Sequence, residues 1–596
     1  MDLRLSQEAV ENLVTQFSSA LDFYRELVQN AIDAGSSSIE VWTEFIPSED
    51  GGGDGTWALH VDDFGEGMNE AVIDDQLTKL FASAKENDLT KIGKFGIGFV
   101  SVFAMKPKAV LVHTGRAGEF WELLFHEDRS FTKTRVDHPV EGTQITVFVG
   151  GDYAGYRETV QGSRETLSRW CAHSETEVTF EDRSPQAGDD RGMEPVNAPF
   201  VASGACGTPA SYAGGTEIVL AYTHRPVYGF YNKGLALAVS ESGEDVMGQH
   251  AGRFGCIGFK IKSRWLEHTL SRETVIRDEN FEKAMAMVHE AADGPLRTSL
   301  VRELERVAAA DDWTLATATT YRRLLRFLAM EPPSIWRDDP ILEARMMRTV
   351  DGEATSLREI AAACRRDDRV YVASVPSPLT KLLAELAIPV LLSDRMASDT
   401  PSKQDPTTHV LVDFLIAQRG VLSGAVDRVF DVDAHAGAME RVVHPQHVFV
   451  PTKKLSAPPP HIEELILRVA RLLDRANVGY SEIAAGTVEA LEEAAPLFVL
   501  GAKLGRLMAR PPGAQYERGR FERPSALINV HHPHFRAIEA MYKKDWSMAV
   551  YCLARSLMLE EDHGIDKDIV LMEHATSSFR RGSSSAWPKT GETRSS

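Results

Sequence analysis

The segment Glu26–Asp33, which reads ELVQNAID, is the feature that most constrains how this chain folds. Glu26, Asn30 and Asp33 follow one another at i, i+4 and i+7, a spacing that places two carboxylates and a carboxamide on one face of a helix. The apolar residues between them can pack against a core on the other side. Taken alone, this polar line is also compatible with a solvated helix face. Because it interrupts the pattern of a core-forming helix, we interpret it as part of a functional site.

The neighbouring sequence predicts an α/β sandwich around this helix. Apolar residues recur at helical spacing over residues 6–34, and Gly35 is a typical helix terminator. Two alternating segments, Ile39–Ile46 and Trp57–Val61, flank the glycine-rich turn Gly51–Gly55 and predict a β-hairpin. This order of elements favours helices on one face of a sheet. The other elements expected here are strands at Ala109–His113, Phe120–Phe125, Thr143–Val149 and Glu177–Phe180, and a helix at Glu158–Cys171.

Three more motifs follow the helix: VDDFGEGM at Val61–Met68, IGKFGIGF at Ile92–Phe99, and the pair Gly142-Thr143. An aspartate at the mouth of a glycine loop can accept a hydrogen bond from an exocyclic amine in an apolar pocket. A glycine-rich turn before a helix can bind phosphate, although the Walker pattern is missing. Each motif alone is compatible with a tight turn or a packing device. Their order within one domain's length indicates a nucleotide site.

These motifs resemble the Bergerat fold of the GHKL ATPases, a superfamily of type II topoisomerases, histidine kinases, mismatch-repair ATPases and heat shock protein 90 chaperones. ELVQNAIDA and IGKFGIGFVSVF are most similar to the chaperones. The resemblance implies an ATPase that uses ATP and Mg²⁺. By this resemblance the chain is identified as a divergent member of the heat shock protein 90 family. Since it ends in GETRSS, without the acidic peptide of the eukaryotic cytosolic members, we expect a bacterial-type member.

The resemblance also assigns roles to single residues. Glu26 would be the general base that orients the attacking water, Asn30 would hold Mg²⁺, and Asp33 would support them. Asp63 would bind the adenine amine. The base pocket would be lined by Gly67, Met68 and Thr143. The phosphate loop would comprise Gly93, Lys94, Phe95, Gly96, Ile97, Gly98 and Phe99.

A second catalytic group is expected far along the chain. Thr269–Thr274, TLSRET, resembles the Ser-Arg-Glu segment of the chaperones' middle domain, which implies that Arg272 reaches the γ-phosphate when domains close. Topoisomerases and mismatch-repair ATPases use a lysine loop instead. Ser271 at a plain helix start is the alternative reading. The segment between Met68 and Gly93 is shorter than the usual lid, and Lys94 replaces a usual glutamine.

The rest of the chain predicts a multidomain protein of α+β and α/β type. We expect a GHKL domain at 1–182, a linker at 183–215, an α/β middle domain at 216–452, a mainly helical C-terminal domain at 461–575 and a disordered tail at 576–596. The C-terminal helices are expected at Ile462–Ala476, Thr487–Ala495, Pro533–Tyr542 and Trp546–Leu559. The last of these would be a dimer-interface helix, or else an internal core helix.

Composition narrows the classes of function. The net charge of −21 argues against binding of a nucleic-acid backbone as the main task. Five scattered cysteines without a C-x-x-C motif indicate a reducing compartment. Neither a membrane span nor a secretory signal is evident. We therefore expect a cytoplasmic protein with no membrane partner.

The expected function is that of an ATP-dependent chaperone. It would bind ATP and ADP, form a homodimer through its C-terminal helices and act on unfolded client proteins. A GHKL ATPase working in DNA transactions or anti-phage defence is the alternative. A sensor histidine kinase is less favoured, and a nucleotide-binding scaffold without hydrolysis stays open.

Overall fold

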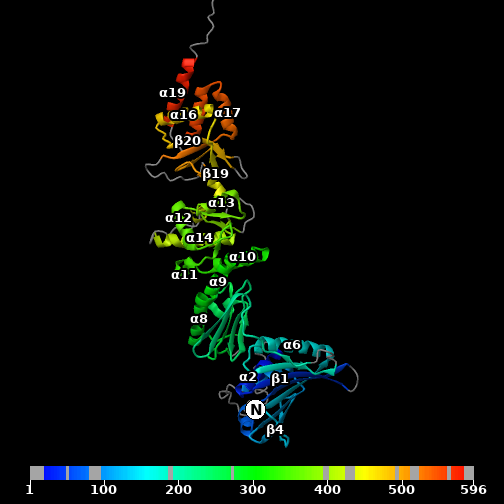
Figure 1. The fold of residues 1–596 in the computed structure, drawn as a ribbon. Coiled ribbons are helices and arrows are strands. Elements are labelled where there is room, and N and C mark those ends of the chain that lie inside the picture. Colours follow the sequence, from blue (N-terminus) through cyan, green and yellow to red (C-terminus); the bar gives the residue numbers. More distant parts are fainter. Residues whose placement is uncertain are drawn as a thin grey trace, which may run out of the picture. The chain divides into compact units, whose positions relative to one another are not determined.

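The computed structural model describes residues 19–48, 53–78, 96–185, 192–269, 274–393, 402–422, 437–489, 495–510, 523–559 and 565–582. The chain divides into two compact units, Met1–Leu300 and Val301–Ser596. Figure 1 colours both along the sequence. This division differs from the domains expected from the sequence, because it cuts the predicted middle domain, 216–452, near its first third.

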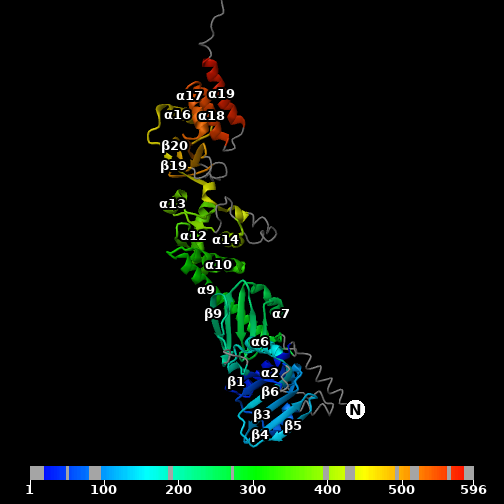
Figure 2. The same ribbon diagram turned by 90° about the vertical axis from the view of Figure 1, so that its right-hand side faces the viewer.

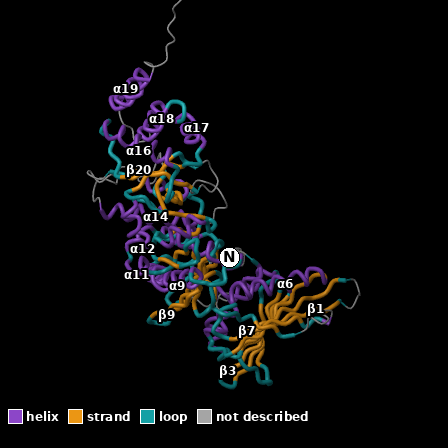
Figure 3. Tube along the Cα trace, turned by 45° about the horizontal axis from the view of Figure 1, so that its top comes forward, coloured by secondary structure: helices purple, strands orange, loops and turns teal. Residues whose placement is uncertain are grey.

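The first unit begins with an eight-stranded mixed sheet, in the order β5-β4-β3-β6-β2-β1-β7-β8. The expected hairpin is β1 and β2, which pair antiparallel, whereas β1 and β7 run parallel. Figure 3 shows these strands beside a long helix. The strands are β1 (Ser38–Pro47), β2 (Asp54–Asp63), β3 (Ala109–Arg116), β4 (Glu119–His126), β5 (Phe131–Arg135), β6 (Thr143–Asp152), β7 (Glu177–Asp182) and β8 (Glu194–Pro195).

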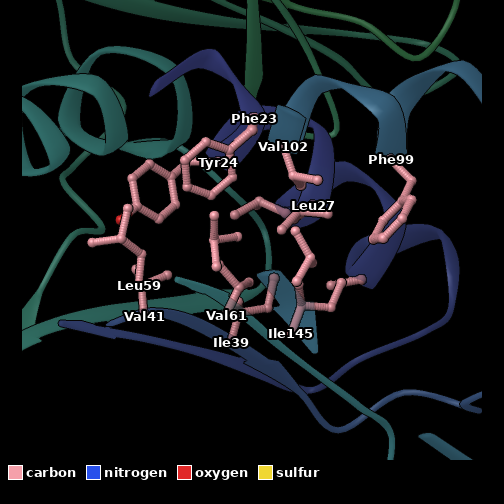
Figure 4. Packing of buried hydrophobic residues seen from close by; sticks show 14 of the residues in the cluster. Phe23, Tyr24, Leu27, Ile39, Val41, Leu59, Val61, Phe99, Val102 and Ile145 are labelled. Carbon is pink, nitrogen blue, oxygen red and sulfur yellow. The ribbon is translucent and has the colours of Figure 1, made fainter. Parts of the chain in front are cut away.

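Helices cover one face of this sheet. Alternate residues of the central strands point toward them, so that strand periodicity and helix periodicity meet in one core. Figure 4 shows Phe23, Tyr24 and Leu27 of the central helix facing Ile39 and Val61 of the hairpin. The helical elements are α2 (Phe23–Asp33), α3 (Glu70–Val72), η2 (Ile73–Leu77), α5 (Gly96–Val100), η4 (Ser101–Met105) and α6 (Tyr153–Cys171). This arrangement confirms the expected mixed α/β domain.

Helix α2 starts later than the sequence suggests. Ser19 forms a capping box, in which its hydroxyl accepts from the N–H of Leu21 (3.3 Å) and its own N–H donates to Asp22 (3.0 Å). A short 3₁₀ turn, η1 (Ala20–Asp22), leads directly into α2. Such a box satisfies the free N–H groups of a helix start. The single helix expected over 6–34 is therefore wrong within the described residues. The expected end is confirmed, since Gly35 has φ +73°.

A second sheet completes the first unit, in the order β12-β11-β13-β10-β9. Its edge strand β9 lies in the segment 183–215 that we expected to be a linker, as does β8. The linker interpretation is wrong for β9, because this segment pairs antiparallel with β10. Pro209 is tolerated there because an edge strand has residues whose N–H groups need not bond to a neighbouring strand. The elements are β9 (Ala205–Tyr212), β10 (Thr216–Tyr222), β11 (Tyr228–Asn232), β12 (Leu235–Ser240), α7 (Gly243–Met247), η6 (Gly248–Arg253), β13 (Ile257–Lys262), α8 (Glu279–Ala291), η7 (Ala292–Leu296) and α9 (Arg297–Ala308).

The second unit opens with helices and a small parallel sheet. It contains a strand–helix–strand unit, in which β16 and β17 pair in parallel and α13 lies between them in sequence. The elements are α10 (Leu315–Met330), η8 (Pro333–Arg337), α11 (Asp339–Glu343), β14 (Met347–Arg348), β15 (Ala354–Thr355), α12 (Leu357–Asp367), β16 (Val370–Ala373), α13 (Pro378–Glu385), β17 (Val390–Leu392), α14 (Pro406–Leu422), β18 (Val442–Val443) and η10 (Pro445–His447).

In the described part of the C-terminal region helices predominate, as expected, but they accompany a closed five-stranded barrel, β19-β20-β23-β21-β22, that the sequence interpretation missed. A helix is expected at Thr487–Ala495, but Thr487 and Val488 belong to strand β20, whose apolar residues are buried by strand pairing. Residues 490–494 of that expected helix lie outside the described ranges. The expected tail at 576–596 begins as helix, up to Gly582. Helices gather beside the barrel strands (Figure 2). The elements are β19 (Phe449–Lys454), α16 (Pro460–Arg475), β20 (Glu482–Val488), β21 (Phe498–Gly501), β22 (Leu507–Ala509), β23 (Ser525–Asn529), α17 (Pro533–Tyr542), α18 (Trp546–Leu559) and α19 (Ile565–Gly582).

Two isoleucines of β1 test the packing beneath α2. Ile39 is fully buried, whereas Ile46 on the same strand is 43% exposed. We expect Ile39→Ala to lower the free energy of unfolding by about 2–5 kcal/mol, because it removes buried methyl groups and leaves a cavity. The matched change Ile46→Ala should cost less than about 1 kcal/mol. Urea-dependent hydrogen exchange of the β1 and β2 amides measures both; equal losses would contradict the assigned core.

Candidate functional site

The polar face of α2 meets the N-terminal end of α5. The Glu26 side chain is only 6% exposed although it lies on the polar line of the helix. A Cβ atom built on Gly98 would lie 3.1 Å from Glu26 Oε2 and 3.8 Å from Asn30 Nδ2. The backbone of α5 therefore lies in close contact with Glu26 and in ordinary van der Waals reach of Asn30. The structure thus brings together Glu26, Asn30 and Gly98, which the sequence assigns to one site.

The loop after β2 is held against two other backbone segments by glycines. Gly142 has φ +65°, and a Cβ there would lie 2.0 Å from the carbonyl oxygen of Asp63. Gly67 has φ +62°, and a Cβ there would lie 2.1 Å from the carbonyl oxygen of Gly115. Side chains at either position would collide with backbone and also adopt a strained conformation. The expected loop residues Asp63 and Gly67 are therefore placed by backbone packing.

The Asp63 carboxyl is partly buried at the end of β2. Burial raises its pKa above the ordinary range, and the backbone N–H groups of Gly65 and Thr143 lower it by hydrogen bonding. The bond from Gly65 is 2.9 Å long. A carboxylate can accept about four hydrogen bonds, so two backbone donors leave it able to accept from a ligand amine. Its position and chemistry fit the expected adenine contact.

Thr114 is a site residue that the sequence interpretation missed. Its buried hydroxyl lies 3.0 Å from Thr143 Oγ1, donates to the carbonyl oxygen of Gly142 (3.1 Å) and accepts from the N–H of Met68 (2.9 Å). One side chain thereby joins β3, β6 and the loop after β2. The available signal was the alternation of β3, in which a threonine occupies a core-facing position.

The same loop is fastened to the C-terminal end of α2. The N–H of Phe64 donates to Ser36 Oγ (2.8 Å), and the N–H of Glu66 donates to the carbonyl oxygen of Ala34 (3.0 Å). Helix α2 is therefore contacted by α5 near Glu26 and by the Asp63 loop at its end. Both groups of expected site residues are arranged along a single helix.

The remaining expected residues fall into four groups. Phe99 lies in the core, 5.2 Å from the ring of Phe125, so only its backbone could contact a ligand. Gly96 and Ile97 belong to the first turn of α5. Asp33 ends α2 and forms an ion pair with Lys233 (2.9 Å). The residues outside the described ranges are Gly93, Lys94, Phe95 and Arg272.

The arrangement fits a magnesium nucleotide. Within the described ranges, no group of three His, Cys, Asp or Glu side chains could hold a metal by itself. Mg²⁺ usually keeps several waters and is held by one or two protein groups together with substrate phosphates. Asn30 beside the glycine backbone of α5 matches that pattern, and the N–H groups at the start of α5 suit phosphate oxygens.

Residues 17–147 match the family model described as "Histidine kinase-, DNA gyrase B-, and HSP90-like ATPase". This segment belongs to the GHKL ATPase superfamily. The match covers α2, the hairpin, the Asp63 loop, α5 and Thr143, which are the elements that form the site. It supports ATP binding and ATP hydrolysis by this domain, usually with Mg²⁺.

Other comparisons add little. Curated protein sequences give no match. A solved structure described as "Crystal Structure of N terminal domain of a DNA repair protein" aligns with a TM-score of 0.34 and 11% identity, covering 50% of this chain and 99% of that chain. A likeness of that size carries no argument about function. No helix in the described part of this chain is long and apolar enough to cross a membrane.

The raised pKa of Asp63 predicts a pH-dependent affinity. A donor amine needs the ionised carboxylate, so adenine-nucleotide affinity should fall as the pH drops through this raised pKa, earlier than for an ordinary aspartate. Asp63→Asn should remove that dependence and weaken binding by about 10–100-fold, because it replaces a charged acceptor. Titration calorimetry with ADP at several pH values measures both effects. Asp128→Asn, in the exposed turn between β4 and β5, is the control; wild-type affinity in Asp63→Asn would contradict the assignment.

Proposed function

We propose that this protein is an ATP-dependent chaperone of the heat shock protein 90 type, which hydrolyses Mg-ATP to open and close a dimer on partly folded clients. The carrying observation is the buried Glu26 that lies beside Asn30 against the glycine backbone of α5. The resemblance of this helix and of the phosphate-loop segment to the chaperones selects that family within the superfamily. Client and partner identities rest on the resemblance alone.

Phosphoryl transfer depends on positioning and charge neutralisation. In the proposed reaction, Glu26 orients a water molecule toward the γ-phosphate and accepts its proton, while Asp63 fixes the adenine. Asn30 would hold Mg²⁺, which supplies neutralising charge to the phosphate oxygens. Burial of Glu26 keeps competing water away from the reacting atoms.

The residues that flank the proposed catalytic Arg272 are hydrogen-bonded to one another across the loop. The N–H of Thr269 donates to the carbonyl oxygen of Thr274 (2.9 Å), and the N–H of Ile276 donates to that of Glu267 (2.8 Å), so the two sides of the loop are bonded together. Burial lowers the pKa of His268 in this stem, and the charge of Arg25 on α2 lowers it further. The positive charge of Arg25 on α2 therefore interacts electrostatically with His268, beside the Arg272 loop.

The second unit carries apolar side chains suited to association. Exposed apolar residues recur on its C-terminal helices, and Arg468 of α16 stacks on the ring of Trp546 of α18 (4.4 Å). Large exposed apolar patches commonly mark association sites. We propose these helices as the place where a second copy or a client binds. The exposed residues are Leu467, Trp546, Met548, Ile569, Val570 and Met572.

Replacement of Glu26 tests the hydrolytic assignment. Glu26→Ala should bind ATP with an affinity within about threefold of wild type, whereas turnover should fall by about 10²–10⁴-fold, because general-base assistance is lost. Glu165→Ala, which removes an exposed carboxylate from α6, should leave both quantities unchanged. Phosphate release and equilibrium nucleotide binding are the measurements. A loss of binding in a folded Glu26→Ala protein would refute the role as base.

The chaperone proposal requires a second measurement on the same preparation. ATPase rate and suppression of aggregation of a thermally unfolded client should both be present, and a competitive inhibitor of the nucleotide site should reduce both. Stimulation of the ATPase by duplex DNA, with binding that weakens steeply between low and moderate salt, would instead establish the alternative role in DNA transactions or defence. Nucleotide binding without turnover would leave only the scaffold.

A further inference from the structure

The turn between β11 and β12 inserts into the GHKL domain. Lys233 and Gly234 have φ +47° and +81°, the left-handed backbone of a tight hairpin turn. A Cβ built on Gly234 would lie 1.7 Å from the carbonyl oxygen of His173, so this turn presses directly on the segment after α6. The N–H of Glu175 also donates to the carbonyl oxygen of Lys233 (3.3 Å). The turn is therefore held in place from several sides.

Apolar packing fixes the base of the turn. Tyr231, Leu235 and Ala236 are buried in the same hydrophobic cluster as α2 and the first sheet. The ring of Tyr231 meets the rings of His173 (5.2 Å) and Phe200 (5.6 Å) edge-on. The β11–β12 hairpin is thus hydrogen-bonded within the second sheet, while side chains at its turn pack in the hydrophobic core of the first sheet.

The tip of the turn contacts the candidate catalytic helix. Lys233 Nζ lies 2.9 Å from Oδ1 of Asp33, whose Oδ2 accepts from Gln29 (3.1 Å). Asp33 ends α2 on the same face as Glu26 and Asn30. A carboxylate at a helix C-terminus is unfavourable next to the negative end of the helix dipole. The Lys233 cation compensates for that repulsion and fixes the last turn of α2.

The preceding residue contacts the other half of the site. Asn232 Nδ2 donates to the carbonyl oxygens of Leu266 (2.9 Å) and Arg264 (3.3 Å), which precede the Arg272 loop. Strand β11 also pairs in parallel with β13, the strand that leads into this segment. Two adjacent residues therefore hold two segments: Asn232 binds the segment after β13, and Lys233 binds the last turn of α2.

We propose that the Asn232–Lys233 turn joins the last turn of α2 to the segment Arg264–Leu266 after β13, with Lys233 acting as a positioning residue for α2 through Asp33. The proposal rests on the proposed ATPase. Lys233 and Asp33 are 47% and 34% exposed, and isolated pairs of that kind contribute little to stability. Loss of this ion pair is therefore expected to make the last turn of α2 more mobile and to lower turnover, while the global free energy of unfolding stays nearly unchanged.

The test compares Lys233→Met with Lys283→Met, which breaks a more exposed ion pair with Glu279 within α8. Hydrogen exchange of the α2 amides in the full chain without nucleotide is the first readout. We expect about 2–5-fold faster exchange in the last turn of α2 for Lys233→Met alone. The second readout is turnover at saturating ATP, which should fall about 3–10-fold while ATP affinity stays within about twofold.

A double-mutant cycle decides whether Lys233 acts through Asp33. In an Asp33→Asn background, Lys233→Met should have no further effect on exchange or turnover. Additive effects, or unchanged α2 exchange in the single variant, would overturn the proposal whether or not the protein hydrolyses ATP. Faster exchange with unchanged turnover in an active enzyme would also overturn it. An inactive wild-type protein would refute the proposed function. The hydrogen-exchange data would still show whether Lys233 positions the last turn of α2 through Asp33.

Discussion

Close approach of backbone segments at glycines is the constraint on which the first unit depends. A Cβ on Gly142 would collide with the carbonyl oxygen of Asp63 at 2.0 Å, and a Cβ on Gly98 would crowd Glu26 Oε2 at 3.1 Å. Through these contacts, α5 and the Asp63 loop meet one helix from two directions. A Cβ on Gly142 would force the Asp63 loop to move, whereas a Cβ on Gly98 would require the Glu26 carboxylate to shift away from the start of α5.

Local patterns predicted the parts of the site that lie on single elements. Helical spacing placed Glu26 and Asn30 on one face of α2, and the alternation of the hairpin placed Asp63 at the end of β2. The end of α2 followed from Gly35. These features are set by the period of a helix or strand and by the backbone freedom of glycine, all of which can be read from a few consecutive residues.

Features that join distant segments could not be read in the same way. Thr114 is a site residue only because β3 lies beside β6 and the loop after β2. The partner of Asp33 is Lys233, two hundred positions later in the sequence. Composition also misled: prolines and glycines around Pro209 suggested a linker, but strand pairing formed an edge strand there. Tertiary pairing decides such segments more strongly than their composition.

The closure of the C-terminal barrel has a consequence for assembly. Each of its five strands has a neighbour on both sides, so this barrel presents no open edge to which a strand from another molecule could add. If another chain binds the described elements of this region, it would therefore contact side chains, such as the exposed apolar ones on α16, α18 and α19. Side-chain interfaces can be separated and re-formed without breaking backbone pairing, which would let the region associate reversibly while its own sheet stays intact.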